Sequence, residues 1–149
     1  MWKSILVAAA LSALAAPAHA QADPTPPMTA EAREEARPLV DTFFATLEAG
    51  HIAKAYGDLF AGTLMASKVI EVQNLITQTN FLFQTYGPIR GWSLMRSDCL
   101  APSMCRNVYM VDTNAAPVFV VLTLYRHPSG WLPTTIYVTD VAQAFFELS

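Results

Sequence analysis

The stretch QTNFLFQTYGPIRGW, residues 78–92, decides the fold because the sequence changes its period within it. Before this stretch, apolar residues recur every three or four positions, as on one face of an amphipathic helix. Gly87 and Pro88 end that helix, and the segments that follow are rich in β-forming residues. Helices followed by a run of strands predict an α+β domain.

Four β-rich runs follow, separated by residues that are typical of turns. They cover Gly91–Cys99, Cys105–Thr113, Val118–Arg126 and Trp131–Val138. The short connections between them predict an antiparallel meander in which neighbouring strands pair in sequence order. Val118–Leu122 is apolar on both faces, which predicts a central strand, whereas Pro133 predicts that the last strand lies at an edge.

Three helices are expected ahead of the sheet. The helical pattern begins near Thr29, and Pro38 forms either a kink or the first turn of the helix. The apolar stripe of this first helix comprises Leu39, Val40, Phe43, Phe44 and Leu47. Gly50 ends it, and a short second helix covers Ile52–Phe60.

The third helix is the longest, and Ser67 is its expected N-cap. Because no other helix matches the sheet in size, we expect this one to cover the apolar face of the sheet. The residues predicted to be buried between helices and sheet are Phe44, Leu47, Ile76 and Phe83. Asp140 and Gln143 resemble a capping box, which predicts a short C-terminal helix reaching Leu148.

The first 20 residues have the pattern of a cleavable signal peptide. Lys3 supplies the positive start, the apolar run that follows is too short to span a bilayer, and Ala18-His19-Ala20 resembles a cleavage site. The alternative is an uncleaved membrane anchor. We therefore expect a signal peptide over residues 1–20, a flexible leader over 21–28, a single domain over 29–149, and a periplasmic or secreted protein.

The two cysteines, Cys99 and Cys105, are the whole cysteine complement. In an exported protein a close pair predicts a disulfide, here one that joins two strands near their turn. The alternatives are a redox pair, which normally has two intervening residues, and a zinc site, which needs two further ligands. We expect the structural disulfide.

The charge balance argues against nucleic-acid binding. The chain has 9 Lys and Arg residues against 12 Asp and Glu residues, and loss of Lys3 with the signal peptide makes the balance more negative. No basic cluster is present to meet a phosphate backbone. We also expect no cofactor, no metal site, and no contact with a membrane after cleavage.

Two stretches resemble the nuclear transport factor 2-like superfamily, in which a curved sheet wraps around helices to form a cone. Phe43–Tyr56 is similar to its first helix, glycine turn and entry to the second helix, and Gln78–Trp92 is similar to its helix-to-sheet junction. The nearest relatives implied are small exported proteins of unassigned function. The resemblance implies N-terminal helices packed on a curved four-stranded antiparallel sheet, with a short C-terminal helix.

The resemblance also allows a test for enzymatic residues. Isomerases of this superfamily carry a tyrosine on the first helix as an oxyanion donor, and that place is held here by Phe43. Their catalytic base is a carboxylate beyond the second helix, and residues 61–66 contain none. We therefore expect no catalytic residue, and a non-enzymatic binding or interaction module. The alternatives are an isomerase-type or hydratase-type enzyme in the cone cavity, and a structural homodimer.

The candidate binding residues are aromatic and basic side chains expected at the cone: Tyr56, Tyr86, Trp92, Arg106 and Tyr109. They would contact a small apolar ligand or a protein partner, or lie near a homodimer contact through the sheet face. The competing interpretation is that the aromatic residues belong to the core and that the arginine is a solvated strand residue.

Overall fold

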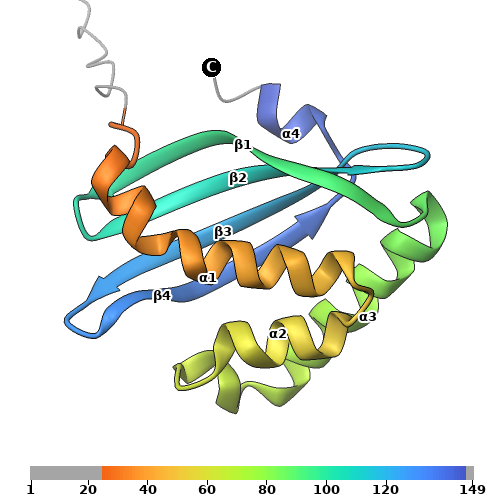
Figure 1. Cartoon of the computed structure of the whole chain (residues 1–149), viewed down its shortest axis with the longest axis horizontal. Helices are drawn as coiled ribbons and strands as arrows, with labels where there is room; N and C mark the ends of the chain where they lie inside the picture. The colour runs from red at the N-terminus through yellow and green to blue at the C-terminus, as the bar shows by residue number, and fades with distance from the viewer. Residues whose placement is uncertain (1–24, 147–149) are drawn as a thin grey trace, which may run out of the picture.

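Helices come first and strands second along the chain, as the change of period predicts (Figure 1). The computed structural model describes residues 25–146, so the predicted signal peptide and the start of the leader lie outside the described residues. The elements in order are α1 (Ala30–Glu48), α2 (Ile52–Phe60), the 3-10 turn η1 (Leu64–Ser67), α3 (Val69–Tyr86), β1 (Ile89–Ala101), β2 (Met104–Thr113), β3 (Val118–His127), β4 (Gly130–Thr139) and α4 (Gln143–Phe146).

The sheet is an antiparallel meander with the strand order β1-β2-β3-β4, and it curls without closing (Figure 1). On β3, Val120 pairs with Tyr109 of β2 and with Val138 of β4, and all three are buried. The predicted central position of this strand is therefore confirmed. Pro133 lies on β4, which is an edge strand, so its missing N–H costs no ladder bond on the outer side.

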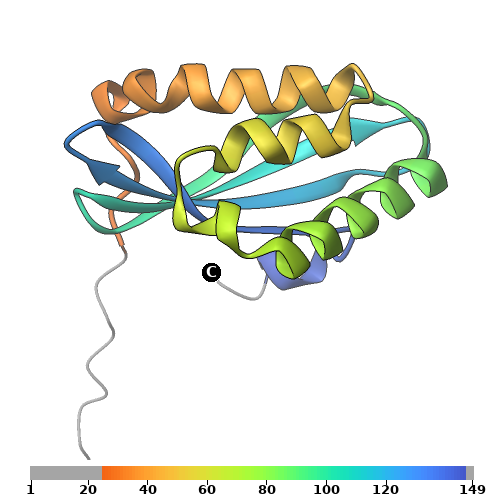
Figure 2. The ribbon, with the colours of Figure 1, turned by 90° about the horizontal axis from the view of Figure 1, so that it is seen from below.

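Helix α1, not α3, covers the concave face of the sheet, and our expectation for the third helix was wrong (Figure 2). Thr29 caps α1 by accepting a hydrogen bond from the Ala32 N–H at 3.2 Å, and Pro38 lies inside the helix without ending it. The buried stripe of α1 comprises Ala32, Ala36, Val40, Phe43, Phe44 and Leu47.

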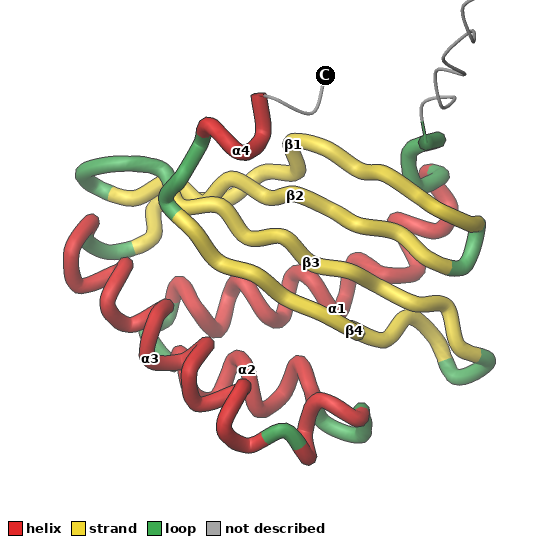
Figure 3. The backbone as a smooth tube through the Cα atoms, turned by 180° about the vertical axis from the view of Figure 1, so that it is seen from behind, coloured by secondary structure: helices red, strands yellow, loops and turns green. Residues whose placement is uncertain are grey.

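Helix α3 instead lies beside the β4 edge (Figure 3). Only Thr79 and Leu82 on it are buried, whereas Ile76 and Phe83, predicted to be core residues, are half-buried. Its Gln78 side chain donates a hydrogen bond to the Val138 carbonyl of β4 at 2.7 Å. Polar residues interrupt its inward stripe, so α3 seals an edge and does not form a layer over the sheet.

The expected N-cap of α3 is corrected. Ser67 is the last residue of η1 and bonds the Leu64 carbonyl, so the N-cap of α3 is Lys68. At α4, the Val141 N–H bonds the hydroxyl of Thr139. Helix α4 begins at Gln143, three residues after Asp140, and the Asp140 carboxylate accepts a hydrogen bond from the Tyr86 hydroxyl. The predicted end at Leu148 lies outside the described residues.

The predicted disulfide is present between Cys99 and Cys105, which face each other across β1 and β2. The segment ahead of α1 packs beside it. The Cys99 N–H donates to the Pro26 carbonyl at 2.7 Å, and the Met28 side chain is 2% exposed. Residues 25–28 of the expected leader are therefore fixed along β1 and contribute to the core, because Met28 is apolar enough to be buried there.

Candidate functional site

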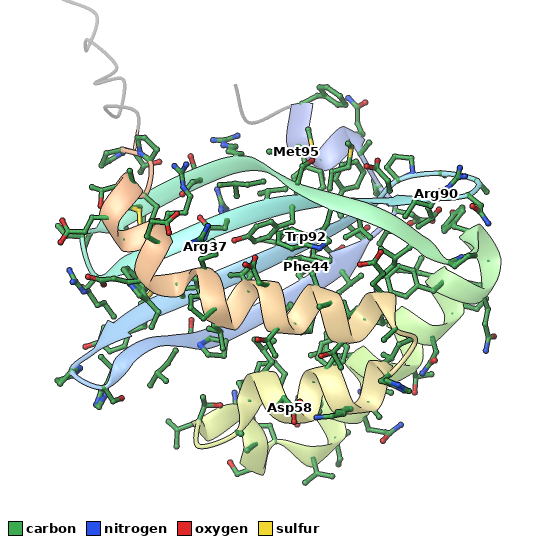
Figure 4. The ribbon with its side chains drawn as sticks, in the orientation of Figure 1. Arg37, Phe44, Asp58, Arg90, Trp92 and Met95 are labelled. Atoms are coloured by element: carbon green, nitrogen blue, oxygen red, sulfur yellow. A yellow bond between two sulfur atoms is a disulfide. The ribbon has the colours of Figure 1, made fainter. Side chains whose placement is uncertain are left out.

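The five candidate binding residues lie in separate places, and the structure brings only two of them together. Trp92 of β1 and Tyr109 of β2 are neighbours on the concave face, with ring centroids 6.3 Å apart in an edge-on arrangement. Phe44 of α1 stacks on Trp92 at 4.6 Å and contacts Tyr109 at 5.0 Å (Figure 4). These three rings fix the position of α1 over β1 and β2.

Tyr56 lies in the core away from this cluster. Its side chain is fully buried, and its hydroxyl shares a 2.7 Å hydrogen bond with Thr79 of α3. Burial raises the pKa of Tyr56, against a smaller opposing effect of the Thr79 hydrogen bond. Its role is to join α2 to α3 through one satisfied buried contact.

Tyr86 and Arg106 lie at two further sites on the surface. The Tyr86 hydroxyl donates to the Asp140 carboxylate, and this bond raises the pKa of Tyr86. It ties the end of α3 to the end of β4. Arg106 lies on the convex face, where its guanidinium pairs with Asp98 at 3.2 Å. Neither residue reaches the concave face, so neither shares a site with Trp92 and Tyr109.

A cavity of about 210 Å³ opens beside the aromatic cluster, between the N-terminal half of α1 and strands β1 and β2. We call it the α1 groove. It is lined by Met28, Arg33, Ala36, Arg37, Val40, Asp41, Trp92, Leu94, Asn107 and Tyr109. The lining is mostly apolar with a few convergent polar groups, which is the usual composition of a small-molecule site.

A buried amide supports the polar part of the groove. Asn107 is 1% exposed, and its oxygen accepts from the Ser97 hydroxyl at 2.7 Å. Its nitrogen donates to the Tyr109 hydroxyl at 3.4 Å and to the Met28 sulfur at 3.6 Å. The Ser97 hydroxyl in turn accepts from the Met28 N–H at 3.1 Å. This chain of contacts fixes the amide, and the Tyr109 hydroxyl acts in it as an acceptor.

The Tyr109 hydroxyl therefore keeps its own proton for a further hydrogen bond. Burial raises the pKa of Tyr109 to about 12, with smaller effects from Asn107, Arg33 and Asp41. The phenol keeps its proton at neutral pH. Within residues 25–146 its recorded hydrogen bond is the one accepted from Asn107, which leaves the proton available to an acceptor in the groove.

Charged side chains of α1 form the rim of the groove. Arg33 donates one hydrogen bond to the Met28 carbonyl at 3.2 Å, and Arg37 pairs with Glu34 at 2.9 Å (Figure 4). Asp41 follows one turn further on. Arg33 and Arg37 are one helical turn apart on the same flank, so both guanidinium groups border the same opening.

Sequence reasoning missed most of the groove. Alternation along β2 from Cys105 places Asn107 on the same face as Tyr109, and this signal was present. The spacing of Arg33 and Arg37 ahead of the apolar stripe was a second signal, but it required knowing that α1 begins before Pro38. Met28 could not be found, because its contribution depends on a contact with β1 far along the chain.

Phe43, which holds the donor position of the isomerases, is a core residue. Phe43 is buried and contacts Phe44 and Tyr56 edge-on, with ring centroids 5.2 and 5.5 Å apart.

Across residues 25–146, no three His, Cys, Asp or Glu side chains come together as metal ligands. None of the helices in this part of the chain is both long and apolar enough to cross a bilayer.

Comparison with known proteins gives no family to which the fold or the groove can be assigned. No family model, no curated protein and no solved structure matches this chain.

Proposed function

We propose that this chain is an exported, non-enzymatic binding module of the nuclear transport factor 2-like type, and that its α1 groove binds a small apolar carboxylate. One observation carries the proposal: the groove combines apolar walls with the protonated Tyr109 hydroxyl and two rim arginines. A signal-like N-terminus and the disulfide support a location outside the cytoplasm, periplasmic or secreted.

The volume of the groove sets the size of the ligand. An apolar cavity of about 150 Å³ accommodates benzene, and sites for drug-sized ligands begin at about 300 Å³. At about 210 Å³, the groove fits one aromatic ring with a short substituent, or an alkyl chain of similar volume. Trp92, Leu94 and Val40 would contact such a ring.

The charges at the rim favour an acid over a neutral ligand. A carboxylate accepts from Tyr109 and from the remaining N–H groups of Arg33, and hydrogen bonds to a charged group are the stronger kind. Asp41 opposes this attraction from one side, so the acid must sit toward the arginines. The ligand is therefore oriented with its ring against the strands and its carboxylate toward the first two turns of α1.

The experiment is an NMR titration with phenylacetate, using phenylacetamide as the neutral control of the same shape. We expect phenylacetate to shift the resonances of Trp92 and Tyr109 with a dissociation constant of about 0.1–1 mM, the range for a ligand of this size. Phenylacetamide should bind at least several-fold more weakly. Equal binding of both, or shifts that avoid the groove, would contradict the proposal.

Two variants test where the carboxylate of the ligand binds. Tyr109→Phe removes the donor and Arg33→Gln removes the charge, and each should weaken phenylacetate binding by about three- to tenfold. Arg90→Gln is the matched control, because Arg90 lies on β1 far from the groove (Figure 4). A similar loss of affinity in Arg90→Gln would show that the net charge of the protein, and not Arg33 at the groove, determines binding.

A second candidate is an isomerase-type enzyme, which one observation favours: Asp41 and Tyr109 line the same cavity and supply a carboxylate and a donor. Against it, Asp41 is exposed, and a hydrated carboxylate is a weak base toward a C–H bond. Incubation with phenylacetone in deuterated water separates the two functions. Deuterium exchange that Asp41→Asn abolishes would establish the enzyme.

A further inference from the structure

Helix α3 carries an exposed stripe that nothing in the α1 groove explains. Ile70, Asn74, Thr77 and Phe81 are spaced by four, three and four residues, so they lie on one face of the helix. Ile70 is 75% exposed and Phe81 is 65% exposed. This face points away from the sheet, because the buried residues Thr79 and Leu82 lie on other sides of the helix.

The same helix is almost without charge. Glu71 is the one charged residue among its 18, and it lies about a quarter-turn away from the stripe. A solvent-facing helix of a soluble domain normally carries several charges, and depletion of charge is a mark of the centre of an interface. The stripe therefore has the composition of a contact surface.

Three polar side chains of α3, one of them Thr77 of the stripe, hydrogen-bond to carbonyls of their own helix. The hydroxyl of Thr77 donates to the Gln73 carbonyl at 2.9 Å, and that of Thr85 to the Phe81 carbonyl at 2.8 Å. The Asn80 amide donates to the Ile76 carbonyl at 3.0 Å. Because the Thr77 hydroxyl of the stripe is satisfied within the helix, covering it does not leave it unpaired, and the cost of its desolvation is reduced.

We propose that this stripe is a homodimer interface in which two copies of α3 pack antiparallel about a two-fold axis. The arrangement is self-complementary, since it places Ile70 of each copy opposite Phe81 of the other, with Asn74 and Thr77 at the axis. The chain as a whole is acidic, so an uncharged stripe is where two copies meet with the least repulsion. This surface is distinct from the sheet face, the homodimer contact considered from the sequence.

The length of α3 sets the strength of the contact. An 18-residue helix is about 27 Å long, so one helix pair buries on the order of 1,000 Å² in total, the lower limit of specific interfaces. The dimer forms reversibly in the micromolar range.

The test is sedimentation equilibrium of the purified, oxidised protein over roughly 1–500 µM, the range in which an interface of this size assembles. Wild type should change from monomer to dimer across the range. Phe81→Glu should raise the dimer dissociation constant at least about tenfold, because it removes an apolar contact and places a carboxylate in the interface. A wild type that stays monomeric throughout would overturn the proposal.

Two further variants identify the surface and the orientation. Met95→Glu on β1 is the matched control, because Met95 is 56% exposed and lies on the sheet, away from α3 (Figure 4). It should leave the dimer unchanged, and a dimer broken by Met95→Glu but not by Phe81→Glu would assign the contact to the sheet face. As a single substitution, Ile70→Lys should weaken the dimer. Combined with Phe81→Glu it should restore the dimer, because antiparallel packing places the new lysine of each copy opposite the new glutamate of the other. Failure of this restoration would exclude the antiparallel register. Thermal unfolding of each variant, all at exposed positions, confirms that the monomer is intact.

Discussion

The two long helices of this protein differ less in length than in how their charges are arranged. Seven of the 19 residues of α1 are charged, and one of the 18 residues of α3 is charged. Yet α1 buries six residues and covers the sheet, whereas α3 buries two and seals an edge. The charges of α1 are confined to its outer faces, which leaves one continuous apolar stripe. Segregation of polar and apolar residues, not their overall proportion, marks the helix that belongs in the core.

The largest expected difference between the helices is the cost of removing one phenylalanine from each. Phe44→Ala should lower the free energy of unfolding by about 3–5 kcal/mol, because Phe44 is fully buried against Trp92 and Tyr109. Phe81→Ala should change it by no more than about 0.5 kcal/mol. Urea denaturation at low protein concentration measures both values. Similar costs would mean that α3 contributes to the core as much as α1 does.

The loss of stability at alkaline pH tests the burial of Tyr109 in the α1 groove. Tyr109 titrates near pH 12 in the folded protein and near pH 10 when unfolded, so the folded state retains a proton that the unfolded chain loses. The stabilisation is complete below pH 10 and is lost as the pH rises toward 12, by about 2–3 kcal/mol. Denaturation at pH 9, 10 and 11 should show this decline, and Tyr109→Phe should make it shallower. Tyr137→Phe, at an exposed tyrosine, serves as the control, and equal slopes in all three proteins would contradict the assignment.

A smaller effect tests how α3 is held. The bond between Tyr56 and Thr79 is buried, so Tyr56→Phe should cost about 1–2 kcal/mol by leaving the Thr79 hydroxyl unpaired. Adding Thr79→Val to that variant should cost less than it does in the wild type, because the orphaned group is removed. A double-mutant cycle measures this coupling. Strict additivity of the two changes would show that the bond does not stabilise the fold.

The strands and the α+β class could be predicted from sequence because each depends on a local pattern. The change of period after Gly87, the apolar run from Val118 and the edge proline at Pro133 all describe short segments whose meaning is the same in any fold. The two cysteines also belong to one hairpin, so each is close to its bonding partner in the sequence.

What could not be predicted depends on contacts between distant segments. Helix length suggested that α3 covers the sheet, but α1 buries six residues there and α3 buries two, and which helix meets the sheet depends on contacts between distant segments. The candidate residues Tyr56, Tyr86 and Arg106 were grouped by chemical type, and the topology separates them. Trp92 and Tyr109 were predicted without the α1 residues that complete the groove beside them.

The contacts at the two edges of the sheet have a consequence for the behaviour of the protein in concentrated solution. An exposed edge strand offers free N–H and C=O groups to strands of other molecules and so begins fibril growth. Here the Pro26 carbonyl accepts the hydrogen bond of the Cys99 N–H on β1, and the Gln78 side chain donates a hydrogen bond to the Val138 carbonyl on β4. A strand arriving at either edge meets a blocked position in its ladder. These two bonds oppose edge-to-edge aggregation, and they do so with residues outside the sheet itself.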